Sequence, residues 1–306
     1  MGTPEPSNDT TLRRGARRAP AGARTRRSSS ARRSFTSTLT ALDALSVAGA
    51  HVSLKVIDLD SGSVVLSGDE HVTLPVGGIG IVPLLIEVAA RMESGSLDPF
   101  EIVDRASVDA VAVAGVWRHL KAPALPIVDL AVLAAATGDA LAANALLDRV
   151  GLDAVRERLG SLGLRRTALL DRFRDERGPD DAPQVALSSP GELAELFAGL
   201  VNSDVVSAAV STQVAEWLSL NEDLSLVASA MGLDPFAHDD DPGGLLFVNK
   251  TGRGDGVLAE AGVVAGPRAG VAYALLVGFD DLSVAHRLRA HDAFRTLGVD
   301  LMEYVH

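Results

Sequence analysis

The stretch "LLFVNKTGRGDGV", residues 245–257, reads as a short apolar strand that runs directly into Lys250, Thr251 and Gly252. Apolar residues bounded by a glycine-rich segment predict a strand over 245–251. The lysine stands out because the chain has three lysines, at 55, 121 and 250, against 25 arginines. A given tripeptide still occurs by chance in about a few per cent of chains of this length. Its meaning therefore depends on the elements around it.

Patterns elsewhere in the chain predict a hairpin, then a long helical block, then more strands. Residues 52–72 alternate apolar and polar positions around Asp60-Ser61-Gly62, which indicates a hairpin. Apolar residues at helical spacing predict the helices. The expected helices are 36–49, 81–95, 126–136, 140–150, 153–162, 190–201, 205–220 and 283–304. The segment 171–185 is polar and reads as a loop, and two further strands are expected at 258–265 and 270–278.

This order predicts a two-lobed α+β fold. The early hairpin needs strands from the far end of the chain to complete one antiparallel sheet, so the helical block is an insertion. The α/β lobe is expected over about 35–80 and 220–306, and the helical lobe over about 81–219. A cleft between two lobes is the default place for a site.

Several motifs resemble class A β-lactamases and the wider penicillin-recognising serine hydrolases. Besides Lys250-Thr251-Gly252, "LKVIDLDSGSVVLSGDEHVTLPVG" is similar to the family's first hairpin, and "DLAVLAAATGDALAANALLDRVG" to the segment with its Ser-Asp-Asn loop. "LLDRFRDERG" and "EWLSLN" resemble the start of the omega loop and a helix before the Lys-Thr-Gly strand. The resemblance covers about 36–306. It implies a β-lactamase/transpeptidase-like fold, an antiparallel sheet flanked by helices with an inserted all-helical lobe.

The family's chemistry needs a nucleophilic serine, a lysine one helical turn later, a second serine for proton relay and an omega-loop glutamate. Residues 74–93 contain neither serine nor lysine. The aligned catalytic positions are occupied by Gly78, Ile81, Gly138, Ala140 and Arg174. Because members of a catalytic unit act together, these losses predict a chain that does not attack a β-lactam. The same alignment predicts that serine at 78 with lysine at 81 would regain acylation at most, because Arg174 still replaces the glutamate.

The positions that match the family's binding wall are retained. Lys250, Thr251 and Gly252 are expected to face a ligand carboxylate or peptide backbone, with Asp139 and Trp117 at the cleft. A structural interpretation stays open for each: Lys250 forms an ion pair, for example with Asp139, and Trp117 packs as core. Gly77, Gly78 and Gly80 are read as neutral replacements for a lost serine, or as exposed amides for an anion.

Three functional hypotheses follow. The first is an inactive β-lactamase-like pseudoenzyme that binds or scaffolds, with a carboxylate- or peptide-like small ligand in the inter-lobe cleft. The second is a β-lactam, peptide or ester hydrolase with a non-standard set of residues such as Lys250, Asp139 and Glu176. The third assigns the function to a basic tail that binds nucleic acid, a membrane surface or an acidic protein.

The tail is the first 34 residues. Through Arg33 it holds nine arginines against Glu5 and Asp9, a formal charge of +7, whereas the remainder carries −19. It is almost free of large apolar groups, so we expect disorder. "ARRSF" at 31–35 has a twin-arginine look, but an amphipathic segment follows, so a cytoplasmic location is favoured over export. Seven histidines without ligand spacing and no cysteine predict neither metal nor cofactor.

Overall fold

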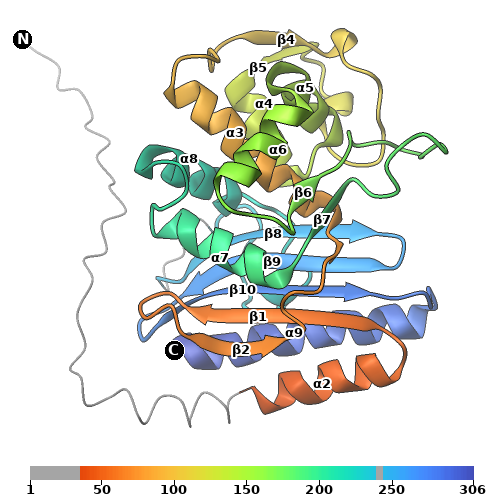
Figure 1. The fold of residues 1–306 in the computed structure, drawn as a ribbon, viewed down its shortest axis with the longest axis vertical. Coiled ribbons are helices and arrows are strands. Elements are labelled where there is room, and N and C mark those ends of the chain that lie inside the picture. The colour runs from red at the N-terminus through yellow and green to blue at the C-terminus, as the bar shows by residue number, and fades with distance from the viewer. Residues whose placement is uncertain (1–34, 239–243) are drawn as a thin grey trace, which may run out of the picture.

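A five-stranded antiparallel sheet forms the centre of the computed structural model, which describes residues 35–238 and 244–306 (Figure 1). The strand order is β2-β1-β10-β9-β8. The strands are β1 (His51–Asp58), β2 (Val64–Gly68), β8 (Leu246–Gly254), β9 (Val257–Ala265) and β10 (Gly270–Gly278). β1 pairs with β10 from His51 opposite Gly278 to Asp58 opposite Val271. The expectation that late strands complete the early hairpin is confirmed.

Two helices cover one face of the sheet. α2 (Thr36–Val47) and α9 (Val284–Val305) lie side by side beneath it in Figure 1. Phe294 and Leu297 of α9 pack with Tyr273 and Leu275 of β10 in one buried cluster. Asp300 of α9 accepts hydrogen bonds from the backbone N–H (3.0 Å) and the hydroxyl (2.7 Å) of Thr38. This buried polar contact fixes the register of the two helices.

The opposite face carries α7 (Pro190–Val201), which packs on β1, β9 and β10 (Figure 1). α7 therefore lies on the sheet although its sequence falls inside the segment 81–219. The other helices of this segment form the second lobe. They are α3 (Ile81–Glu93), α4 (Ile127–Thr137), α5 (Ala140–Val150), α6 (Leu152–Ser161) and α8 (Ala208–Ser219).

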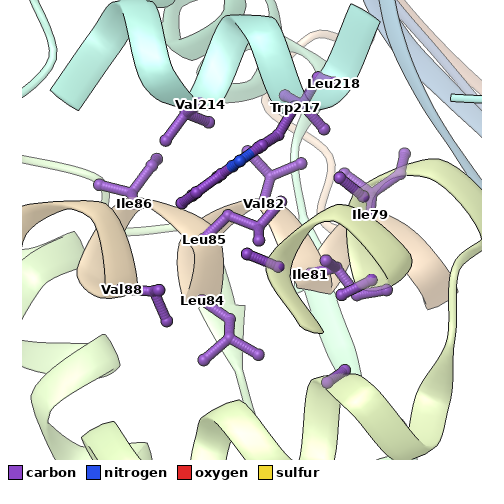
Figure 2. Packing of buried hydrophobic residues seen from close by; sticks show 14 of the residues in the cluster. Ile79, Ile81, Val82, Leu84, Leu85, Ile86, Val88, Val214, Trp217 and Leu218 are labelled. Atoms are coloured by element: carbon purple, nitrogen blue, oxygen red, sulfur yellow. The ribbon is translucent and has the colours of Figure 1, made fainter. Parts of the chain in front are cut away.

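α3 is the central helix of that lobe. Its residues from Ile81 to Ala90 are all buried, as the apolar run of sequence predicts. Figure 2 shows Trp217 of α8 lying over Val82, Leu85 and Ile86 of α3. Pro83 is the third residue of the helix, where its missing N–H breaks no intrahelical hydrogen bond.

Helix ends follow recognisable sequence signals. Ser189, Ser207 and Ser283 accept hydrogen bonds from backbone N–H groups in the first turns of α7, α8 and α9. α4 ends at Gly138, which has a φ of +63°, a left-handed conformation that favours glycine. The predicted helix ends are within two residues of the observed ends in most cases, but helix 205–220 begins later, at Ala208.

The structure also contains short elements that the sequence patterns did not predict. β3 (Leu74–Pro75), β6 (Ala168–Leu169) and β7 (Ala186–Ser188) form a small sheet, and β4 (Ile102–Asp104) pairs with β5 (Ala124–Pro126). The short 3-10 helices are η2 (Gly77–Gly80), η3 (Arg105–Ser107), η4 (Trp117–His119) and η5 (Val227–Ala230). η2 leads directly into α3 and places Gly78 beside β8.

Candidate functional site

The Lys-Thr-Gly strand and the glycine segment before α3 lie in direct backbone contact. A Cβ added to Gly252 would stand 1.8 Å from the Val76 carbonyl oxygen, and one added to Gly78 would stand 3.0 Å from the Thr251 carbonyl oxygen. Gly77 has a φ of +49°, and a Cβ there would lie 2.6 Å from the Arg253 carbonyl oxygen. These glycines permit the close approach of η2 to β8. A serine at position 78 would press against that strand.

Lys250 is buried, and two of its three ammonium hydrogens are used inside the protein. Its Nζ donates to the Ala135 carbonyl oxygen near the end of α4 (2.6 Å) and to Asn221 Oδ1 (3.0 Å). Burial lowers the pKa of Lys250 to about 8, against the opposing effect of the negative charges of Asp223 and Glu222. Lys250 thus joins the sheet to the helical lobe.

The expected ion pair between Lys250 and Asp139 is wrong, because the Asp139 carboxylate has other partners. Oδ1 accepts a hydrogen bond from Ala142 N (2.9 Å), which caps α5. Oδ2 accepts from Val116 N and Trp117 N, both at 2.7 Å. Asp139 is 1% exposed, so its observed contacts are structural.

The sequence left two alternatives for Trp117, a ligand contact at the cleft or a core position, and the structure shows the core position. Its side chain is 0% exposed and belongs to the main apolar cluster with Ile81. Its indole N–H has no hydrogen-bond partner among residues 35–238 and 244–306. A side chain so fully enclosed does not present a surface to a ligand.

The positions that align with the family's catalytic residues are only partly brought together. Gly78 lies against Thr251, and a Cβ at Gly138 would stand 3.8 Å from Lys250 Nζ. Ile81 is 0% exposed and lies among the apolar side chains around α3 (Figure 2). Ala140 is likewise buried in the first turn of α5. The positions that align with a nucleophile and its base thus carry glycine and alkyl groups.

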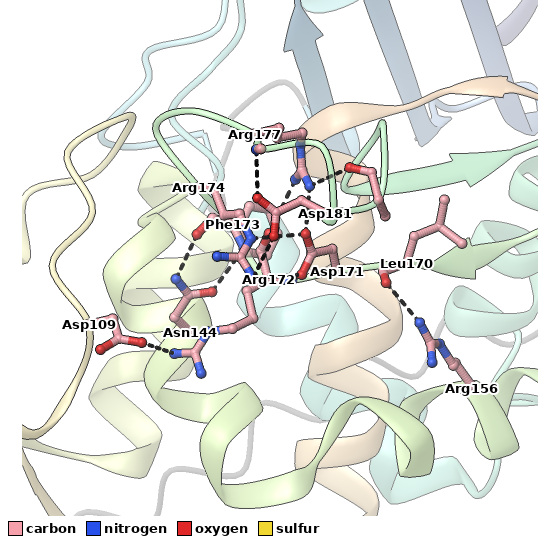
Figure 3. A network of polar contacts seen from close by, with 12 residues as sticks. Asp109, Asn144, Arg156, Leu170, Asp171, Arg172, Phe173, Arg174, Arg177 and Asp181 are labelled. Atoms are coloured by element: carbon pink, nitrogen blue, oxygen red, sulfur yellow. Dashed lines mark hydrogen bonds and ion pairs between the residues drawn. The ribbon is translucent and has the colours of Figure 1, made fainter.

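Arg174 belongs to an ion-pair network in the loop 171–185 (Figure 3). Its Nε donates to Asp171 Oδ2 at 3.0 Å, and its Nη2 lies 3.2 Å from Asp181 Oδ1. Arg177 donates to Asp171 Oδ2 as well, at 2.7 Å. The hydrogen bond that Arg174 donates to Asp171 raises the pKa of Arg174, which keeps its charge. Arg174 is therefore held by loop carboxylates.

The same loop is fastened to α5 through Asn144. The Asn144 amide donates to the Phe173 carbonyl oxygen (2.8 Å) and accepts from Phe173 N (3.0 Å) (Figure 3). Glu176, named in the alternative hydrolase set, is exposed on this loop. Lys250 and Asp139 bind separate partners, so the described contacts do not bring these two residues and Glu176 together.

Asp223 is a site residue that the sequence did not indicate. Its Oδ2 accepts hydrogen bonds from Thr251 Oγ1 (2.7 Å) and Arg253 Nε (3.1 Å), and its Oδ1 accepts from the backbone N–H and the hydroxyl of Ser225. Partial burial acts to raise the pKa of Asp223, but hydrogen bonds from Arg253, Ser225 and Thr251 prevail and lower it to about 2. The Thr251 hydroxyl is thus already bound to a carboxylate of the same chain.

A buried relay of polar side chains continues from Lys250 into the sheet. Asn221 Nδ2 donates to Asn249 Oδ1 (2.9 Å), and Asn249 Nδ2 donates to Glu260 Oε1 (2.8 Å). Glu260 also accepts from Tyr273 Oη and Val227 N, both at 2.7 Å. Burial raises the pKa of Glu260 to about 7, although these three donors act to lower it. In the sequence, the only indication of this buried network is Glu260, a glutamate within an apolar strand.

A match to a protein-family model shows the family of this chain. The model of the beta-lactamase enzyme family matches residues 34–305. The chain belongs to the beta-lactamase enzyme family. No curated protein sequence matches it. The resemblance inferred from the sequence motifs is confirmed at the level of the family.

Solved structures of beta-lactamase-like proteins share the fold. A beta-lactamase from Sphaerobacter thermophilus DSM 20745 has a TM-score of 0.76 and 21% identity, covering 89% of this chain and 97% of that one. A beta lactamase from Burkholderia vietnamiensis gives 0.71 and 18%, with coverages of 89% and 96%. PBP-A gives 0.72 and 18%, with coverages of 87% and 96%. The α+β, β-lactamase/transpeptidase-like fold is established.

Two further properties of the described residues bear on the sequence predictions. No helix within residues 35–238 and 244–306 is long and apolar enough to cross a membrane. The same ranges hold no group of three or more His, Asp or Glu residues placed to hold a metal ion. The basic tail, with the disorder expected for it, lies outside the described residues, so that expectation stays a prediction.

Proposed function

We propose that this member of the beta-lactamase enzyme family is a pseudoenzyme that acts as a binding or scaffolding module. The observation that carries the proposal is the backbone contact between η2 and β8 at Gly78. In this arrangement the place of a nucleophile is taken by a residue without a side chain, and a Cβ there meets the Thr251 carbonyl oxygen at 3.0 Å. Nothing at position 78 can form an acyl bond.

The surroundings of Gly78 support the same proposal. Acylation requires a base beside the nucleophile to accept its proton. Ile81, one turn along, is an alkyl side chain enclosed in the core. Arg174, on the loop that would hold a base for deacylation, is a cation paired with Asp171 and Asp181. Each group that moves a proton in a serine hydrolase of this fold is replaced by one that does not.

The test of this proposal is a combined turnover and adduct assay. A chromogenic cephalosporin reports hydrolysis, and intact mass after incubation with a fluorescent penicillin reports a covalent adduct. The expected result is no turnover above a heat-inactivated control and no mass increase. Turnover or an adduct would support the alternative hydrolase, and the variants Lys250→Met and Glu176→Gln would then show whether those residues carry it.

A tail-mediated function remains a separate prediction. Deletion of residues 1–33 is expected to abolish any salt-dependent binding to nucleic acid or anionic liposomes, because the tail carries nine arginines. Comparing full-length and truncated chains at two salt concentrations measures this effect. An unchanged binding profile would show that the tail does not carry this binding.

A further inference from the structure

Asp223 lies at the centre of a set of donors that converge on its carboxylate. Thr251 and Arg253 are two residues apart on β8, so their side chains leave the same face of the strand. Thr251 Oγ1 and Arg253 Nε both donate to Oδ2, at 2.7 and 3.1 Å. Arg253 Nη2 (3.3 Å) and Ser225 N (3.2 Å) donate to Oδ1. Both oxygens are therefore bound, as in a bidentate anion site.

The backbone segments that carry Thr251 and Arg253 are held in place independently of Asp223, whereas the Arg253 guanidinium is bound by Asp223 and Ser225. Thr251 and Arg253 belong to β8, whose pairing with β9 places Thr251 opposite Glu260 and Arg253 opposite Leu258. Asp223 belongs to a different element, the loop that follows α8. Removal of its carboxylate would leave a hydroxyl and a guanidinium on the sheet edge, with one uncompensated positive charge.

The position is open to an outside molecule on the side of Arg253 and Asp223, whereas Thr251 lies deeper and is 8% exposed. β8 is an edge strand of the sheet, and the side chains of Arg253 and Asp223 retain 42% and 32% of their exposure. The carboxylate of Asp223 stays ionised at neutral pH because its pKa is about 2. The Asp223 carboxylate is thus an anion that the chain itself supplies to these donors at all times.

We propose that Asp223 is an internal ligand that fills a carboxylate site formed by Thr251 and Arg253, and that an external carboxylate binds only when the Asp223 side chain turns away from these donors. This inference rests on the proposed binding role and names its ligand class, a small molecule or peptide with a free carboxylate. It also gives a reason why the intact chain would bind such ligands weakly. The Asp223 carboxylate competes with such ligands for Thr251 and Arg253.

The test compares benzoate with benzamide, its neutral counterpart, by calorimetric titration. Asp223→Ala is expected to bind benzoate at least tenfold more tightly than the unmodified chain, with no change for benzamide. The double variant Asp223→Ala/Arg253→Gln is expected to lose the gain. Glu222→Ala is the matched control, because it removes the neighbouring exposed carboxylate, and it should behave as the unmodified chain.

Equal benzoate affinity in the unmodified chain and Asp223→Ala would overturn the proposal, as would a gain that persists without Arg253. If Asp223→Ala does not fold by circular dichroism, Asp223→Asn removes the charge at nearly constant volume and must still show at least a threefold gain. The chromogenic cephalosporin assay on the same variants separates the two proposals. Benzoate binding without turnover supports both, whereas turnover overturns the pseudoenzyme alone.

Discussion

Gly78 lies so close to β8 that a Cβ at this position would stand 3.0 Å from the Thr251 carbonyl oxygen. Such a distance is tighter than nine in ten real Cβ contacts. The neighbour here is backbone in a strand paired along its length with β9, so it yields less readily than the end of a flexible side chain. The absence of a side chain at position 78 is therefore accompanied by close packing of η2 against β8.

The double variant Gly78→Ser/Ile81→Lys is expected to remain unacylated by penicillin. The serine presses against Thr251, and the lysine enters a core position that is 0% exposed, which costs at least about 3 kcal/mol of unfolding free energy. This revises the expectation from sequence that acylation would return. Intact mass and urea unfolding measure both effects, with Gly78→Ala as the control for the contact alone. A mass increase of one penicillin would contradict the prediction.

Asn144→Ala is expected to release the 171–185 loop. The substitution removes the two hydrogen bonds to the backbone of Phe173 and leaves buried groups without partners, at a cost of about 2–4 kcal/mol. Hydrogen exchange in this loop should accelerate more than in the sheet. Glu176→Ala, on the exposed part of the same loop, serves as the control and should leave exchange unchanged. Equal exchange in both variants would mean that Asn144 does not hold the loop.

Asp139→Ala is expected to destabilise the protein by about 2–4 kcal/mol. It removes the cap of α5 and the acceptor for Val116 N and Trp117 N in one step. Trp117 fluorescence should shift to longer wavelength as the segment loosens. Asp129→Ala removes an exposed carboxylate from the first turn of α4 and should cost less than about 1 kcal/mol. A similar cost for both variants would argue against the structural role of Asp139.

Glu260 is expected to make stability depend on pH between about 4.5 and 7. In this window the folded state binds a proton at Glu260 that the unfolded state does not, so the contribution of the residue to stability falls as pH rises. The change is up to about 3 kcal/mol. It is measured as the difference in unfolding free energy between the unmodified chain and Glu260→Gln at pH 5 and pH 7.5.

That difference should decrease from pH 5 to pH 7.5. Asp223 and Lys250 affect stability mainly at pH values outside this range, because their pKa values are about 2 and about 8. Both also remain in the variant and cancel in the comparison. Parallel profiles for the two proteins would show that Glu260 does not titrate within the window.

The sequence predicted the fold well because the fold depends on local patterns. The alternation in 52–72 and the apolar run from Ile81 placed the hairpin and the central helix, and β1 pairs with β10 as expected. The cap at Asp139 was also readable, since Asp directly before a helical run is a capping signal. A carboxylate that caps a helix is less available for an ion pair with Lys250.

The details of the site depend on tertiary contacts that no local pattern contains. The approach of Gly252 to the Val76 carbonyl oxygen joins residues far apart in the chain, and Asp223 resembles any polar loop residue. The partners of Lys250, Ala135 and Asn221, come from two separate helix ends. Such convergence becomes visible only when the elements are placed in space.

The position of β1 between β2 and β10 has a consequence for synthesis of the chain. His51 pairs with Gly278, more than 200 residues later, so the first hairpin emerges from the ribosome long before its second neighbour exists. An isolated two-stranded hairpin is marginal in water. The helices of the helical lobe all precede β8 in the chain, so this lobe is free to form earlier. Translation that stalls before β10 would therefore leave β1 and β2 as the exposed, aggregation-prone part of the nascent protein.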